Sequence, residues 1–257
     1  MRARRLGQSS VELSRLAFGT MRLDERRLDE RACEHLINDS LARGITTFHS
    51  SIEYESFPRF CAILRRLGVR GREIQNVVKL AEPHFGDTSF DESRLREKVE
   101  AYLTKLGARR IDVVQWMWRG DLKDEEARLA GFARQRDEMQ AAFNALRKEG
   151  KIGAVATFPY TVGFANAVLS ARFSDGLAVY LNPFEQEMLG HVDRAAAIGA
   201  GIVAIRPLAA GRAAEEGIDV ATCIRDVFSK PAVSTAVVTY SSLGHMEELV
   251  RAADAAG

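Results

Sequence analysis

The sequence predicts an α/β fold, a single (β/α)8 barrel that occupies residues 1–257. Short runs of apolar or β-branched residues alternate along the chain with polar-faced helical runs, a pattern typical of a parallel sheet covered by helices. Eight such strand–helix units follow one another, which favours a closed barrel over an open doubly wound sheet. The chain is 46% hydrophobic, so it can bury one large core. No linker or second domain is visible.

The first half of the chain is expected to hold four of these units. Helices begin where Asp or Ser can cap the first turn, and they end where Gly can adopt a left-handed conformation. The charged, Gly-interrupted segment 119–137 is expected to be an insertion after the fourth strand, at the face where barrel sites form. We expect strands over residues 13–21, 45–49, 75–80 and 111–118. We expect helices from Asp29 to Gly44, from Ser56 to Gly68, from Asp91 to Gly107, and over residues 139–147.

The second half continues the same alternation. Its apolar runs have the length of buried parallel strands, and its helical runs have one apolar face. We expect strands over residues 152–157, 177–181, 201–205 and 235–240. We expect helices over residues 162–171, 192–198, 220–228 and 246–253.

Charge and composition exclude several classes of partner. The net charge is +1, which gives no electrostatic case for binding nucleic acid or an anionic membrane surface. No run of about 18 apolar residues occurs, and residues 1–5 lack the apolar segment of a signal peptide, so we expect a cytoplasmic protein without a membrane span. The scattered cysteines are expected to be reduced, buried thiols, with no metal site: Cys33, Cys61 and Cys223.

Residues 44–54, Gly-Ile-Thr-Thr-Phe-His-Ser-Ser-Ile-Glu-Tyr, resemble the second strand and following loop of the aldo-keto reductase superfamily. In that family a Gly-Ile run ends in Asp-Thr-Ala, and a catalytic Tyr follows a few residues later. Further matches extend over nearly the whole chain, at residues 5–7, 16–21, 77–79, 106–107, 111–115, 150–153, 202–211 and 237–248. The resemblance implies a (β/α)8 barrel with a short N-terminal β-hairpin.

The resemblance also implies which residues would carry the chemistry. The family uses Tyr as the proton donor to a carbonyl oxygen, Lys and His to support it, and Asp to hold the Lys. By position, the Tyr is Tyr54 and the Lys is Lys79, while His49 replaces the Asp and Met117 replaces the His. The catalytic tetrad is therefore degenerate. The resemblance implies Tyr54 as acid, Lys79 as its support and His49 as an exchanged catalytic group.

NADP(H) is the cofactor that the resemblance implies. The family's side-chain contacts to it fall here on Ala156, Thr157, Ala178, Ile205 and Leu249, so few of those polar contacts are retained. The remaining positions include backbone-type contacts and a serine pair where the family often binds phosphate. They are Gly19, Thr20, Pro207, Leu208, Ser241 and Ser242.

The substrate is expected to be a small molecule, and an anion is one candidate class. Arg119 and Arg206 are placed at the barrel mouth, where they could join Lys79 in a cationic pocket or instead pair with loop acids such as Glu185 or Asp121. Lys79 itself would need an anionic partner in place of the missing Asp. The candidates are Glu53, Glu82 or a bound ligand, and the pocket wall is expected to include Met117 and Trp118.

Three functions remain open from the sequence. The first is an NADP(H)-linked oxidoreductase acting on carbonyl compounds with an altered active site. The second is a redox-free lyase or isomerase that uses His49, Tyr54 and Lys79 on an anionic substrate. The third is a non-catalytic binding or regulatory barrel, since a fold alone does not specify a reaction. The sequence does not specify the oligomeric state.

Overall fold

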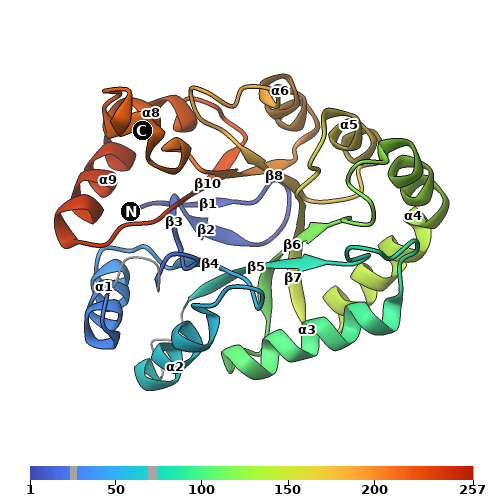
Figure 1. The fold of residues 1–257 in the computed structure, drawn as a ribbon, viewed down its shortest axis with the longest axis horizontal. Coiled ribbons are helices and arrows are strands. Elements are labelled where there is room, and N and C mark those ends of the chain that lie inside the picture. The colour runs from blue at the N-terminus through green and yellow to red at the C-terminus, as the bar shows by residue number, and fades with distance from the viewer. Residues whose placement is uncertain (24–27, 69–73, 257) are drawn as a thin grey trace.

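A closed barrel of parallel strands forms the centre of the molecule (Figure 1). The computed structural model describes residues 1–23, 28–68 and 74–256. Within these residues, eight strands pair in the order β10-β3-β4-β5-β6-β7-β8-β9. The strands are β3 (Leu16–Gly19), β4 (Thr47–Ser50), β5 (Gln75–Ala81), β6 (Ile111–Met117), β7 (Ile152–Thr157), β8 (Gly176–Tyr180), β9 (Gly201–Ile205) and β10 (Val233–Val238). The predicted (β/α)8 barrel is confirmed.

Helices surround this barrel as an outer ring (Figure 1). Each long helix except the C-terminal α9 lies between one barrel strand and the next, as parallel strand pairing requires. They are α1 (Glu30–Ala42), α2 (Phe57–Leu67), α3 (Glu92–Leu106), α4 (Glu125–Lys148), α5 (Val162–Ala171), α6 (Leu189–Ile198), α8 (Val220–Phe228) and α9 (Leu243–Ala255). Between β9 and α8 lie the short 3₁₀ helix η2 (Ala209–Gly211) and the single turn α7 (Arg212–Glu215). No helix among the described residues is both long and apolar enough to span a bilayer.

An N-terminal hairpin closes one end of the barrel. Strands β1 (Ala3–Arg5) and β2 (Glu12–Ser14) pair antiparallel, as expected, and lie across the middle of the ring in Figure 1. The fully buried side chains of Leu6 and Leu13 pack there against inward-facing barrel residues such as Val77. The expected single strand over residues 13–21 is therefore two strands, with the chain leaving the hairpin before it enters the barrel.

Side chains alternate between the inside and the outside of the barrel along each strand. On β6, Val113 packs in the interior cluster, whereas Val114 and Trp116 pack in the outer core against the helices. The same alternation turns Gln115 and Met117 toward the interior. Toward their carboxyl ends the strands thus carry polar or flexible side chains on the inner face, which leaves space for a site.

The segment after β6 differs from the sequence expectation. Most of residues 119–137 belong to α4, which is 24 residues long and starts at Glu125. Its N-cap is Asp124, whose side chain accepts a hydrogen bond from the Ala127 N–H. Gly131, which suggested an irregular insertion, lies within the helix. A larger residue would not fit at this position, because a Cβ there would lie only 2.8 Å from Cζ2 of Trp118. The glycine thus allows close packing of the helix on the barrel and does not interrupt it.

The predicted helix ends are largely confirmed. Asp29 and Asp91 cap α1 and α3 with their side chains, and Gly107 ends α3 with a φ of 62°. Ser56 precedes α2 but makes no capping bond, because its hydroxyl donates to the Thr20 carbonyl at 2.8 Å. This bond ties the start of α2 to the end of β3, beside the site. All three cysteines are buried thiols, as predicted.

Candidate active site

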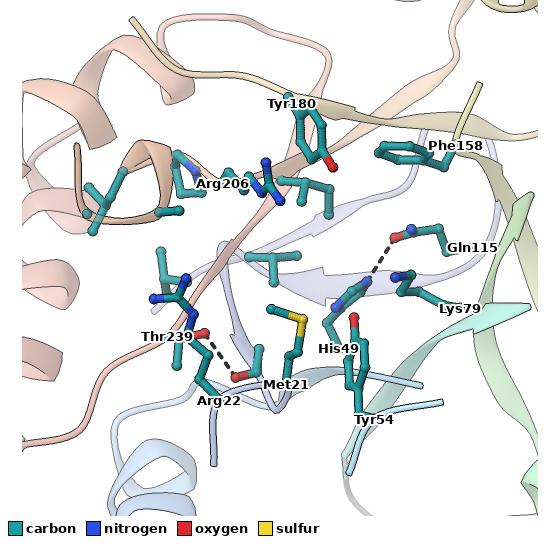
Figure 2. Close-up of a pocket in the computed structure, with 18 of the residues that line it drawn as sticks. Met21, Arg22, His49, Tyr54, Lys79, Gln115, Phe158, Tyr180, Arg206 and Thr239 are labelled. Atoms are coloured by element: carbon teal, nitrogen blue, oxygen red, sulfur yellow. Dashed lines mark hydrogen bonds between the residues drawn. The ribbon is translucent and has the colours of Figure 1, made fainter. Parts of the chain in front are cut away.

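A cavity of about 310 Å³ opens where the barrel strands end (Figure 2). Such a position follows from the fold, because the loops after the strands of a (β/α)8 barrel form its binding face. Residues from all eight barrel strands or from the loops that follow them line it. The sequence-predicted residues that the structure brings together here are Gly19, His49, Tyr54, Lys79, Met117, Arg206, Pro207 and Leu208.

Other predicted residues do not line this cavity. Trp118 follows the outward register of Trp116 and packs in the outer core, with its ring 6.4 Å from that of Phe164. Thr20 is fully buried and donates its hydroxyl to the His49 carbonyl at 3.2 Å. Ser242 caps α9 by accepting from the His245 N–H. Neither Ser241 nor Arg119 reaches the lining.

Tyr54 and Lys79 meet at one side of the cavity, next to His49 (Figure 2). The Lys79 ammonium lies over the face of the Tyr54 ring, 5.2 Å from its centroid, in cation–π geometry. Burial raises the pKa of the Tyr54 hydroxyl well above its usual range, with smaller contributions from Tyr102 and Glu53. The Tyr54 phenol is therefore protonated at neutral pH and can donate a proton or a hydrogen bond.

Lys79 has no carboxylate partner among the residues that the structure describes. Burial lowers the pKa of its ammonium, and the positive charges of Arg119 and Arg206 also lower it, while Glu53 raises it. Glu53, one expected partner, pairs with Arg119. Glu82, the other, is fully buried and pairs with Lys98 of α3, 2.5 Å away. Neither acid takes the role that Asp has in the family.

His49 is almost fully buried, with an exposed fraction of 5%. Its Nε2 lies 2.8 Å from Oε1 of Gln115, an oxygen that can only accept, so Nε2 carries the hydrogen. Burial lowers the pKa of His49 to about 4, the Gln115 bond opposes this shift, and the charge of Lys79 adds to it. The imidazole is neutral at pH 7, and burial rather than the charge of Lys79 is the main cause.

Gln115 is a site residue that the sequence reasoning missed. It is buried, lines the cavity and pairs in register with Lys79 of the neighbouring strand. The available signal was its position two residues before Met117, because residues i and i+2 of a strand share a face.

Arg119 crosslinks three loops beside the cavity. Its guanidinium donates to both Glu53 carboxylate oxygens, at 2.7 and 2.8 Å, and its Nε donates to the Tyr160 hydroxyl at 3.1 Å. Its Nη2 also lies 3.9 Å from the sulfur of Met117. The loops after β4, β6 and β7 are joined in this way. The Arg119 charge is neutralised by Glu53, and not by Asp121, the loop acid that was one alternative from the sequence.

Arg206 lies at the opposite wall, after β9. Its guanidinium is 4.5 Å from the centroid of the Tyr180 ring and 3.8 Å from Oε1 of Glu185, the loop acid that the sequence suggested. Its backbone φ is 54°, a left-handed conformation that is uncommon for a residue other than glycine. Ala209 and Ala210 share this conformation, so the segment after β9 holds strained backbone at the cavity edge.

The residues on the β9 and β10 side fit part of a nicotinamide dinucleotide. Arg22 and Arg206 line the cavity there and match the charge of phosphates, and Pro207 and Leu208 form its wall. The positions that would hold the nicotinamide carboxamide offer fewer hydrogen-bonding groups, because Ala156 and Ala178 are apolar and buried. The Thr157 hydroxyl is occupied by a bond to Ser174, and Leu249 packs in the core. The cavity thus offers more side chains that could bind the cofactor phosphates than side chains that could bind the nicotinamide ring.

Comparison with known proteins agrees with this geometry. The aldo/keto reductase family model matches residues 15–222. Two solved structures from Pseudomonas aeruginosa, one of them PA4992, are assigned to the aldo-keto reductases; they share 26% and 27% sequence identity with the chain and both have a TM-score of 0.78. The matches cover 99% of this chain and 95% and 94% of theirs.

A third structure, the aldo-keto reductase AKR11C1 from Bacillus halodurans in its holo form, is 19% identical, with a TM-score of 0.75 over 98% of this chain and 90% of its own. It shares the fold. Comparison with curated proteins returns no match. The family match covers most of the sequence. The chain therefore belongs to the aldo/keto reductase family.

Proposed function

We propose that this protein is an NADP(H)-linked oxidoreductase that reduces carbonyl compounds with an altered active site. The observation that carries the proposal is the protonated Tyr54 phenol beside the Lys79 cation in the strand-end cavity. Family membership supports the reaction type, and the cytoplasmic location expected from the sequence belongs to the same proposal.

Tyr54 would act as the general acid. Its hydroxyl would donate a proton to the carbonyl oxygen as negative charge develops there, and the Lys79 ammonium would stabilise the resulting phenolate. No Asp in the described part of the chain holds the lysine, so no carboxylate there neutralises its charge. Met117 cannot donate a hydrogen bond to the oxygen, and loss of a positioned acid–base group costs about 10²–10⁴-fold in rate. We therefore propose a slow or narrowly specialised enzyme.

His49 would have an electrostatic and structural role. It is neutral and its Nε2 hydrogen is bound to Gln115, so it does not place a second cation beside Lys79. A pKa of about 4 makes it a weak base at pH 7. This weighs against the redox-free lyase or isomerase, in which His49 would remove a proton from the substrate.

The cofactor would lie along the β9 and β10 side of the cavity. Arg22 and Arg206 would hold its phosphates, and Pro207 and Leu208 would contact it with backbone and apolar atoms. When bound, it would supply the hydride for the reduction. With Ala156 and Ala178 at the carboxamide positions, we expect weaker binding than a full set of amide contacts would provide.

The test is a titration of NADPH into the purified protein, followed by a screen of aldehydes and ketones for NADPH oxidation. Tyr54→Phe should leave cofactor affinity intact and reduce turnover at least about 100-fold, because the proton donor is lost. Tyr240→Phe is the matched control, since it removes a hydroxyl that bonds Ser40 outside the cavity.

No NADPH binding at millimolar concentration would contradict the proposal. Turnover that survives in Tyr54→Phe would contradict the role of the phenol. Affinity for small anions without cofactor binding would favour the redox-free enzyme or the non-catalytic binding protein instead.

A further inference from the structure

The charged side chains of the cavity wall are all positive among the described residues. Of the described residues that line it, three are cations, namely Arg22, Lys79 and Arg206, and none is a carboxylate. The whole chain has a net charge of only +1, so this imbalance is local and does not reflect a generally basic surface. A concave wall with only positive charge favours anionic ligands.

The three cations lie at different parts of the cavity. Figure 2 shows Arg22 and Lys79 on opposite sides of the drawn pocket, with Arg206 near Tyr180. Arg22 and Arg206 are on the side where the proposed cofactor phosphates would lie. Lys79 is on the other side, with His49 and Gln115, where a carbonyl would meet the Tyr54 hydroxyl.

Among the described residues, the Lys79 ammonium has no carboxylate paired with it. Its contact with Tyr54 is through the ring face, and the acids near it are paired elsewhere, Glu53 with Arg119 and Glu82 with Lys98. A partly buried ammonium gains most from an anion that can reach it directly. The cofactor phosphates would be satisfied on the far side, so the anion at Lys79 would have to come from the substrate.

We propose that the substrate is a carbonyl compound that carries its own carboxylate, with the carboxylate bound by Lys79 and the carbonyl oxygen at the Tyr54 hydroxyl. This inference rests on the proposed function and specifies its substrate class. A cavity of about 310 Å³ that also has to admit part of the cofactor favours a short oxo acid. Apolar side chains such as Phe158 and Ile205 would enclose its carbon chain.

The reaction balances without a further reactant. The carbonyl carbon would gain one hydride from NADPH, which becomes NADP⁺, and the carbonyl oxygen would gain one proton from Tyr54. The product would be a hydroxy acid with its carboxylate unchanged. Tyr54 would recover its proton from water.

The experiment compares kcat/KM for acids and their neutral esters, using 4-oxobutanoate with methyl 4-oxobutanoate and glyoxylate with its methyl ester. The wild-type enzyme should prefer the acid by about 10–100-fold, the effect of one charge-assisted hydrogen bond. Lys79→Gln should abolish this preference, and Lys79→Arg should retain part of it. Lys148→Gln, on the exposed end of α4, is the control that removes a lysine outside the cavity and should keep the full preference.

The acid-to-ester ratio separates two roles of Lys79. If Lys79 only stabilises the Tyr54 phenolate, Lys79→Gln slows both substrates equally and the ratio is unchanged, which would overturn the inference. Equal use of acid and ester by the wild type would also overturn it while leaving the proposed reductase intact.

Binding of succinate, which cannot be reduced at a carbonyl, is measured by calorimetry with and without NADPH to separate the two proposals. Binding that Lys79→Gln abolishes, in a protein that oxidises no NADPH, would support the anion site while the reductase proposal fails. Succinate binding that is absent or unchanged in Lys79→Gln would overturn the anion site.

Discussion

His49 shows how far one buried side chain departs from its behaviour in water. It takes the position where the family has a carboxylate, yet it enters the core as a neutral imidazole bonded to Gln115. Desolvation disfavours its charged form more than the hydrogen bond favours it. The exchange of Asp for His therefore replaces a negative charge with a neutral group, and Lys79 loses its counter-ion.

The lowered pKa of His49 predicts a pH dependence of stability. Between pH 6.5 and about 4 the unfolded chain binds a proton at His49 and the folded chain does not, so the free energy of unfolding falls as pH falls. The pKa shift of His49 corresponds to a loss of about 3 kcal/mol in the free energy of unfolding over that pH range. His49→Gln should flatten this part of the curve in urea denaturation from pH 7 to pH 4.

His35→Gln, on the exposed face of α1, is the control and should leave the curve unchanged. Carboxylates contribute their own acid dependence to all three proteins, so the difference between curves is the quantity that tests the prediction. A wild-type curve parallel to that of His49→Gln would show that the imidazole titrates normally in the folded protein.

At the scale of elements, helix α3 holds the end of the strand that carries Lys79. Lys98 donates to the Ala81 carbonyl at 2.7 Å and pairs with the Glu82 carboxylate, which is fully buried. Arg94 of the same helix lies 3.3 Å from the other carboxylate oxygen. The helix thus neutralises a buried charge immediately after β5 and fixes the direction in which the chain leaves the barrel.

Lys98→Met should therefore be strongly destabilising. It leaves the Glu82 carboxylate with Arg94 alone, and breaking a buried ion pair in this way costs on the order of 3 kcal/mol. Lys105→Met, on an exposed position of the same helix, should change the free energy of unfolding by less than about 0.5 kcal/mol. Chemical denaturation at pH 7 measures the free energy of unfolding of both variants. An equally small decrease in Lys98→Met and Lys105→Met would mean that Arg94 is a sufficient partner for Glu82.

At the scale of the whole molecule, the two ends of the barrel have separate tasks. The hairpin closes one end with Leu6 and Leu13, whose side chains are fully buried against the barrel interior. The strand ends at the other side and the loops that follow them form the cavity. The residues that stabilise the fold at the hairpin end are thus separate from the residues that line the cavity, as is usual in this fold.

Leu13→Ala should test this separation. Truncation of a fully buried leucine leaves a void and costs about 2–5 kcal/mol in the free energy of unfolding. NADPH affinity and turnover of the folded variant should stay near the wild-type values, because the hairpin does not line the cavity. Leu243→Ala, at a side chain that is 45% exposed, is the control and should be nearly neutral. A large loss of cofactor affinity in Leu13→Ala would show that the two ends are coupled.

The sequence predicted much of this arrangement. Alternating apolar runs and capping residues such as Asp29 and Asp91 determine the elements locally, so they could be read without knowledge of the fold. Tyr54, Lys79 and His49 could be placed together because each lies at or just after the end of a parallel strand, and those ends meet at one face.

What the tertiary structure alone decided is the environment of each group. The register of β6 turns Gln115 into the cavity and Trp118 away from it, and Arg119 pairs with Glu53 across 66 residues of sequence. The charge of a side chain follows from its type, which the sequence contains. Its pKa and its partner depend on burial and on distances to other charges, and these exist only once distant segments have packed together.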